Sequence, residues 1–213
     1  MEPIILASES QRRQDFFKLM GLPFTVLPAG IDETPQRGLS PRQAAEDLAL
    51  RKTAVIVERI KNAEITNNNP IPHSSFLISN SSPLWIFAAD TIVVLDGKIY
   101  GKPENRDDAG RMLRSLAGRR HEVVTAMALY SGRDEKTDCR SVTCEVLFAP
   151  LSPAGIEWYL DTDEWQGAAG AYRLQETGGC LIKGIHGSPS AVAGLPLHDF
   201  YVMLRDNGYP FGA

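Results

Sequence analysis

The chain has 213 residues, with 22 basic and 26 acidic side chains and a formal net charge of −4. At roughly 100–200 residues per domain, this length indicates one large domain or two small ones. The hydrophobic fraction of 43% and the charged fraction of 23% are typical of a globular protein with a substantial core. The mild acidity argues against a nucleic-acid partner, because a broad binding surface for nucleic acid needs a clear basic excess.

The sequence also predicts where the protein acts. No apolar run approaches the ~18 residues of a membrane span, so we expect no membrane partner. The first residues, Met1-Glu2-Pro3, are acidic and lack the layout of a secretory signal. The three cysteines form neither an even set for disulfides nor a closely spaced metal-binding pair. We therefore expect a cytoplasmic protein with reduced thiols.

Helices and strands are expected to alternate in the first half of the chain, on the basis of hydrophobic spacing and turn residues. Ser10 and Ser40-Pro41 are suited to begin helices, and Asp96-Gly97 is typical of a hairpin turn. In chain order we expect a strand at about 3–7, a helix at 11–20, a strand at 24–28, a helix at 41–61, strands at 84–89 and 92–95, and a returning strand at 98–100.

A long hairpin is expected in the second half. Two β-branched runs, at about 121–131 and 139–149, should pair antiparallel across a polar loop. The expected elements around this hairpin are a helix at about 106–117, a helix from Ser152-Pro153 to about residue 160, a Gly-rich, strand-like stretch to residue 185, and a helix at about 196–206.

This mixture predicts an α/β protein with a mixed sheet, because the chain is too rich in strands for a helix bundle. One domain is expected to cover residues 1–213. Residues 66–83 are rich in Asn, Ser and Pro, a composition that favours turns and solvated loops. We interpret them as an irregular insertion inside that domain.

The first candidate site is the junction between the first strand and the first helix. Ser8, Ser10, Arg12 and Arg13 bring two hydroxyls and two guanidinium groups to a helix start, where free N–H groups favour anions. This combination suits phosphate oxygens. The alternative is that Ser10 only caps the helix and both arginines are solvated.

Lys52 and Asp90 are candidates because of their apolar surroundings. Lys52 lies within the apolar stripe of the helix at 41–61, so it needs either an anionic partner or a stem that reaches water. Asp90 follows a buried run and precedes β-branched residues, which predicts a pause or bulge in the strand. A carboxylate there is suited to bind metal or act as a general base, whereas the alternative is a turn-forming aspartate.

Three further polar residues complete the set. Lys102 stands between a glycine and a proline that fix the local backbone, so its side chain is expected to be aimed. Glu33 adds an acid beyond the second strand, although loop acids are usually solvated. Gln175 carries a donor and an acceptor, as reading a nucleobase edge requires, but it also fits a surface position. Cations, carboxylates and an amide together predict phosphate-ester or phosphoanhydride chemistry.

Seven segments resemble one known family when they are taken together and in order. They are LASESQRR at 6–13, IDE at 31–33, LALRK at 48–52, AADTIVV at 88–94, GKP at 101–103, AGAYRLQ at 169–175 and AGLPL at 193–197. In these segments the chain resembles the Maf family, described both as septum-formation inhibitors and as nucleoside triphosphate pyrophosphatases. Residues 178–197 are more similar to the branch acting on dTTP and UTP than to the 7-methyl-GTP branch.

The resemblance implies a mixed-sheet fold, similar to the inosine triphosphate pyrophosphatases, with two lobes flanking a central cleft. It implies hydrolysis of a nucleoside triphosphate to a monophosphate and pyrophosphate with Mg²⁺ or Mn²⁺. Asp90 would accept the proton or bind the metal, and Glu33 would support the metal and the attacking water. The other roles implied are triphosphate binding by Ser8, Arg12, Arg13, Lys52 and Lys102, and substrate selectivity through Arg12, Thr91 and Gln175.

The chain departs from the family pattern at a few positions. Gln11 replaces a usual proline, Gly167-Ala168 replaces an acid and a lysine, and Arg173 replaces a frequent glycine. Two alternative functions stay open: hydrolysis of 7-methyl-GTP, and regulation of cell division through protein binding with weak catalysis. A homodimer is compatible with the sequence.

Overall fold

The computed structural model describes residues 1–66 and 84–212, without the side chains of residues 63–66. Apart from its first residue, the expected insertion at 66–83 therefore lies outside the described residues. In the described parts of the chain, no helix combines the length and the apolar character that crossing a membrane requires. The expectation of one domain stays a prediction.

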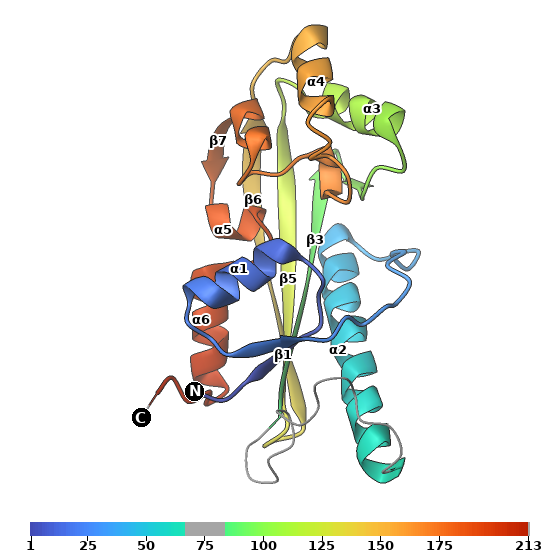
Figure 1. Cartoon of the computed structure of the whole chain (residues 1–213). Helices are drawn as coiled ribbons and strands as arrows, with labels where there is room; N and C mark the ends of the chain where they lie inside the picture. The colour runs from blue at the N-terminus through green and yellow to red at the C-terminus, as the bar shows by residue number, and fades with distance from the viewer. Residues whose placement is uncertain (67–83, 213) are drawn as a thin grey trace.

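Strands and helices follow one another along the described residues (Figure 1), together with two short 3-10 helices there, named η2 and η3. In chain order they are β1 (Ile4–Leu6), α1 (Gln11–Leu19), β2 (Phe24–Val26), α2 (Pro41–Thr66), β3 (Trp85–Leu95), β4 (Lys98–Tyr100), α3 (Arg106–Leu116), β5 (Arg120–Ser131), β6 (Lys136–Phe148), α4 (Pro153–Leu160), η2 (Ala169–Ala171), η3 (Thr177–Leu181), β7 (Ile182–His186), α5 (Pro189–Val192) and α6 (Leu197–Asp206).

One mixed sheet, with seven strands in the described part of the chain, organises these elements. Its order is β2-β1-β3-β5-β6-β7, and β4 pairs with β3. β1 is parallel to β2 and to β3, whereas β3, β5, β6 and β7 pair antiparallel. The expected α/β class with a mixed sheet is confirmed, as is the antiparallel pairing of the two long β-branched runs.

One edge of β3 is shared by two short strands. β1 pairs with residues 85–87 and β4 pairs with residues 93–95, so residues 88–92 have no strand partner on this edge among the described residues. Asp90 lies at the middle of this stretch. The expected break in the strand at Asp90 is wrong, because β5 pairs with β3 without a register shift from Trp85 to Val94. The interruption is in the neighbours of β3 and not in β3 itself.

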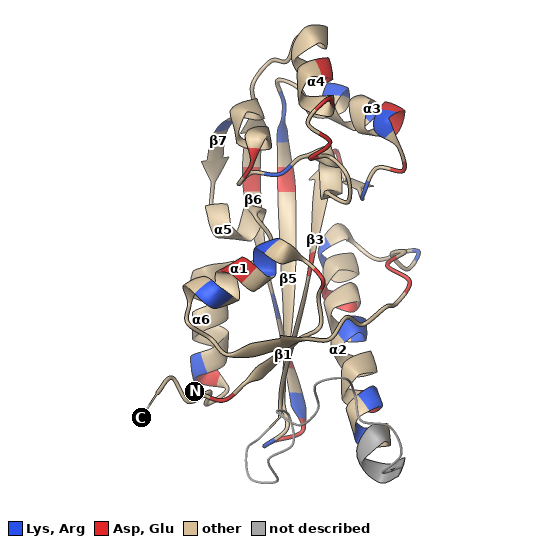
Figure 2. Cartoon of the chain, in the orientation of Figure 1, with Lys and Arg blue, Asp and Glu red and all other residues tan. Residues whose placement is uncertain are grey.

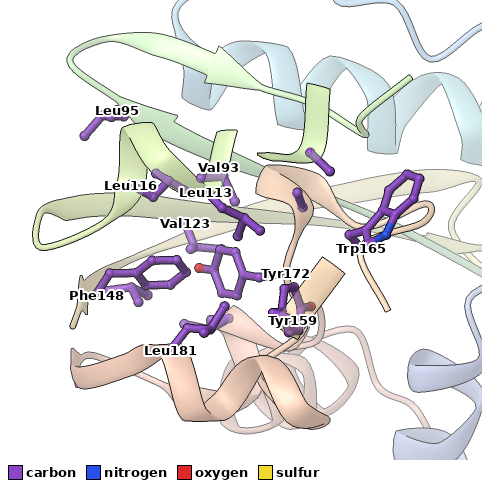
Figure 3. Packing of buried hydrophobic residues seen from close by; sticks show 14 of the residues in the cluster. Val93, Leu95, Leu113, Leu116, Val123, Phe148, Tyr159, Trp165, Tyr172 and Leu181 are labelled. Atoms are coloured by element: carbon purple, nitrogen blue, oxygen red, sulfur yellow. The ribbon is translucent and has the colours of Figure 1, made fainter. Parts of the chain in front are cut away.

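The core is divided between the two ends and the two faces of the sheet. At the end that carries β4, side chains from α3, α4, β5, β6 and the 3-10 helices pack around Tyr172 and Phe148 (Figure 3). At the other end, Phe17 of α1 meets Phe87 of β3 and Phe200 of α6. α2 covers the opposite face. Two separately packed ends are what the expected two-lobed fold requires.

The expected helix starts after Ser10, Ser40 and Ser152 are confirmed, and two of these three serines cap their helix through the side chain. The Ser40 hydroxyl accepts from the N–H of Gln43, whose side chain accepts from the N–H of Ser40, which is a capping box. The Ser152 hydroxyl caps α4 by accepting from the backbone N–H of Gly155. Ser10 stands at the cap position of α1, but its side chain makes no capping hydrogen bond.

The Gly-rich stretch before residue 185 is the largest correction, because only β7 is a strand there. The backbone at Gly170 has a φ of 67°, which interrupts any extended run. Further along, the Glu164 carboxylate accepts from the N–H groups of Thr177 and Gly178, 3.2 Å away in each case, and so holds the start of η3. Tertiary contacts therefore override the strand-like composition.

Candidate active site

Asp90 lies at the centre of the candidate site, on the unpaired stretch of β3. Successive strand residues face opposite sides of a sheet, so Asp90 faces α2 while Thr91 faces α1. Asp90 is only 8% exposed although it is charged. A buried carboxylate needs a cation or hydrogen-bond donors, and α2 supplies them.

Lys52 of α2 is the partner of Asp90. Its Nζ lies 2.7 Å from Asp90 Oδ1 and 2.7 Å from Glu33 Oε1. Lys52 is 6% exposed, so its ammonium is held by carboxylates and does not reach into bulk water. Of the two interpretations of this lysine, the one with an anionic partner is confirmed.

Glu33 joins Lys52 to Lys102. The Lys102 ammonium donates to the second carboxylate oxygen of Glu33. Burial would raise the pKa of Glu33, but hydrogen bonds from Lys102 and Lys52 outweigh it and lower that pKa to about 2. We name Glu33, Lys52, Asp90 and Lys102 the carboxylate–lysine cluster. Within it, two acids and two lysines converge from four separate segments of the chain.

A second group of predicted residues lies on the other face of β3, around Arg13. Its guanidinium donates to the Ser8 hydroxyl at 3.0 Å, to the Thr91 hydroxyl at 3.2 Å and to the Gly194 carbonyl at 3.0 Å. Arg13 is 8% exposed, so the interpretation of a solvated arginine is wrong. Burial lowers the pKa of Arg13, while the charges of Asp90 and Glu33 act in the opposite sense.

Thr91 extends this group across the sheet. Its hydroxyl lies 2.9 Å from the hydroxyl of Thr125, its cross-strand neighbour on β5. Thr125 in turn donates to the carbonyl of Ala191 on α5 at 2.8 Å. Arg13, Thr91 and Thr125 therefore connect α1, β3, β5 and the turn after α5 in one hydrogen-bonded chain.

Arg12 and Gln175 lie at the outer part of this region. Arg12 makes no hydrogen bond or ion pair within the described residues, and burial with the nearby charges of Arg13 and Arg173 lowers its pKa to about 10. The charge of Glu176, next to Gln175, acts in the opposite sense and raises the pKa of Arg12. Gln175 is exposed and donates to Glu176 at 3.3 Å.

Figure 2 shows basic segments of α1 and α2 on either side of the middle of β3, where hydrogen bonds join them to Thr91 and Asp90. The structure thus brings most predicted residues together. Ser10 contributes through its backbone N–H, which donates to the Ser8 hydroxyl at 3.3 Å.

Sequence reasoning missed Thr125 and Glu176 as members of this region. Thr125 lies in a β-branched run whose hydroxyls give no hint of a cross-strand partner. Glu176 could have been found from the sequence, because an acid next to Gln175 is able to accept a hydrogen bond from the glutamine amide.

The two carboxylates of the cluster could hold a divalent metal. In the described residues, no group of three or more His, Cys, Asp and Glu side chains could hold a metal ion. Mg²⁺ is commonly bound through one or two carboxylates, with substrate phosphate and water oxygens as its other ligands. Asp90 and Glu33, which share one ammonium partner, fit that donor set.

A family model described as Maf-like protein matches residues 3–207. The chain belongs to the Maf family. A dTTP/UTP pyrophosphatase of Pelotomaculum thermopropionicum is 37% identical over 209 residues, covering 98% of this chain and 98% of the relative. One of Symbiobacterium thermophilum is 40% identical over 210 residues, covering 99% and 96%. The expected family is therefore confirmed, and the seven Maf-like segments all fall on described residues.

A solved structure also aligns with this Maf chain. The Ham1 protein of Staphylococcus aureus is 18% identical and has a TM-score of 0.38, covering 70% of this chain and 72% of that protein.

Proposed function

We propose that this protein is a nucleoside triphosphate pyrophosphatase that cleaves the α–β phosphoanhydride of dTTP and UTP, releasing a monophosphate and pyrophosphate. The observation that carries the proposal is the convergence of Lys52 and Lys102 with Asp90 and Glu33 beside the unpaired stretch of β3. Membership of the Maf family and relatives named dTTP/UTP pyrophosphatase support the choice of substrate.

In the proposed reaction, Asp90 accepts the proton of the water that attacks the α-phosphorus. A general base must lie within hydrogen-bond reach of this water, and the unpaired edge of β3 leaves Asp90 without a covering strand. The oxygen of the water forms the new bond to phosphorus, and pyrophosphate leaves with the electrons of the broken anhydride bond. Lys52 holds the Asp90 carboxylate in place through its 2.7 Å hydrogen bond.

The phosphates are proposed to bind the cations at the rim of the site. Lys102 and Arg12 suit this role because Lys102 is largely exposed and Arg12 has no protein hydrogen bond among the described residues. Cations on phosphoryl oxygens stabilise the charge that accumulates during phosphoryl transfer. Arg13 donates to three protein acceptors, which supports a contribution through the placement of Ser8 and Thr91.

We propose Mg²⁺ or Mn²⁺ as the cofactor, held by Asp90 and Glu33. When bound, a divalent metal neutralises phosphate charge and polarises the phosphoryl group. Lys52 contacts both carboxylates and keeps them together before the nucleotide arrives.

Product analysis tests the proposal. Purified protein is incubated with dTTP, UTP, CTP, GTP and 7-methyl-GTP in Mg²⁺ or Mn²⁺, and the products are separated by ion exchange. We expect the monophosphate and pyrophosphate, with dTTP and UTP turned over faster than 7-methyl-GTP. Release of orthophosphate and a diphosphate would refute the proposed bond. A cytoplasmic location and a homodimer stay predictions, which cell fractionation and analytical ultracentrifugation would test.

A further inference from the structure

The loop that carries Gln175 has a firmly anchored backbone. Before it, the Tyr172 hydroxyl lies 2.8 Å from Nε2 of buried His121, and the Tyr172 ring meets Phe148 within the core (Figure 3). After it, Gly178 and Gly179 lie so close to the backbone of residues 173 and 174 that a Cβ atom at either position would approach a carbonyl oxygen to 2.7 Å or less. The direction in which the Gln175 side chain leaves the backbone is therefore well defined.

Three side chains on this loop form a hydrogen-bonded relay that ends at Gln175. Arg173 donates through Nη2 to the carbonyl of Gln166 at 2.7 Å, and through Nη1 to Glu176 Oε1 at 3.3 Å. The same Glu176 oxygen accepts from Nε2 of Gln175, also at 3.3 Å. Arg173 therefore holds Glu176, and Glu176 holds the amide group of Gln175.

A carboxylate selects one orientation of a neighbouring amide. Ionised Glu accepts hydrogen bonds only, so it attracts the NH₂ side of Gln175 and repels its carbonyl oxygen. Rotating the amide by half a turn would place two oxygens against each other. Within the described residues, Gln175 Oε1 has no hydrogen-bond partner, so the relay leaves an acceptor facing outward.

We propose that Arg173 and Glu176 are positioning residues that fix the Gln175 amide so that the site selects uracil and thymine over cytosine. The proposal rests on the pyrophosphatase function proposed above, with Gln175 as the base-reading residue. N3 of uracil and thymine carries a hydrogen and can donate a hydrogen bond to the Gln175 carbonyl oxygen. N3 of cytosine is itself an acceptor, so its lone pair would repel that oxygen. A freely rotating glutamine could serve both bases.

The test is the ratio of kcat/KM for UTP to kcat/KM for CTP in wild type and in Glu176→Gln. The substituted amide is nearly the same shape but can either donate or accept, so it no longer orients Gln175. We expect this ratio to fall about tenfold, in the range of one charge-assisted hydrogen bond. The decisive sign is a rise in kcat/KM for CTP, because mere damage to the loop would lower the values for both substrates.

A second pair of variants tests the first link of the relay. Arg173→Met keeps a long apolar stem without the donors to Glu176 and should also lower the UTP:CTP ratio. Arg173→Lys keeps a cation and should restore part of it. The matched control is Glu58→Gln, a carboxylate-to-amide change at an exposed position of α2, which should leave the ratio unchanged.

The outcomes separate this inference from the proposed function. An unchanged ratio in Glu176→Gln, or equal losses for both substrates, overturns the orienting role. A wild-type enzyme that releases pyrophosphate from UTP and CTP equally also overturns it but leaves the pyrophosphatase function standing. If no nucleotide is hydrolysed, calorimetric dissociation constants for UTP and CTP still give the ratio, and tighter UTP binding that Glu176→Gln abolishes supports the relay.

Discussion

The Lys52 ammonium and the Asp90 carboxylate lie 2.7 Å apart, although 38 residues separate them in the chain. α2 brings Lys52 across the face of β3 at the point where, among the described residues, that strand has a neighbour on only one edge. The same ammonium holds Glu33, so one buried cation organises both acids. This arrangement is the basis for the first two predictions.

Asp90→Asn should abolish most of the activity. An amide nearly matches the carboxylate in size but cannot accept the proton of the attacking water. We expect kcat with UTP to fall at least about 100-fold, the lower range for loss of a general base. Asp134→Asn, at an exposed turn position, is the matched control. A mutant with near-normal turnover would exclude Asp90 from proton transfer.

Lys52→Met should destabilise the fold as well as reduce activity. Methionine retains the length of the stem, but the Asp90 carboxylate then lacks its buried cation. Removing one partner of a buried ion pair typically costs about 3–5 kcal/mol, so we expect the free energy of unfolding in urea at pH 7 to fall by about 3 kcal/mol.

The control for this change lies on the same helix. Lys61 is about half exposed and pairs with exposed Glu135. Exposed pairs contribute about 1 kcal/mol or less, so Lys61→Met should change the unfolding free energy by no more than that. Equal losses in the two variants would contradict the importance of burial at Lys52.

His121 should make stability depend on pH. Burial lowers the pKa of His121 from 6.5 to about 4, so the unfolded chain takes up this proton before the folded protein does. Its stabilising contribution is complete above pH 6.5 and is lost as the pH falls toward 4. We expect about 2 kcal/mol of the unfolding free energy to be lost at pH 4.5 through this residue.

His121→Gln isolates that contribution. Glutamine does not titrate and can still bond to Tyr172, so the loss of unfolding free energy between pH 7 and 4.5 should be smaller than in wild type. Chemical denaturation at each pH measures the unfolding free energy of wild type and variant, and so how steeply each depends on pH. Parallel curves for the two proteins would mean that His121 does not carry this pH dependence.

Gly194→Ala should disturb the hydrogen bonds that Arg13 makes to its protein acceptors. Gly194 has a backbone φ of 109°, a value that residues with a side chain rarely adopt. Its carbonyl accepts a hydrogen bond from Arg13. Backbone strain of this kind costs about 1–3 kcal/mol, and a shifted carbonyl should also raise KM for UTP. Gly184→Ala, without a positive φ and with open space around it, is the control. Identical stability and KM in both variants would disprove this role of Gly194.

Features that depend on neighbouring residues could be predicted from the sequence. The capping box at Ser40, the cap at Ser152 and the hairpin turn at Asp96-Gly97 are all formed within a few residues. Lys52 and Asp90 were also identifiable, because a charged residue in an apolar run calls for a partner, whereas Arg12 and Arg13 were indicated by their place at a helix start. The partner itself could not be read from the same local pattern.

Tertiary structure decided the features that depend on distant segments. Asp90 lies in an unbroken strand because β5, more than thirty residues later, pairs with it throughout. The Gly-rich segment forms 3-10 turns because Glu164 and close glycine packing hold its backbone. The sequence by itself determined the residue types, the turns and the family. Only the tertiary structure decided which charges meet, because burial and strand pairing act between parts of the chain that have no local relation.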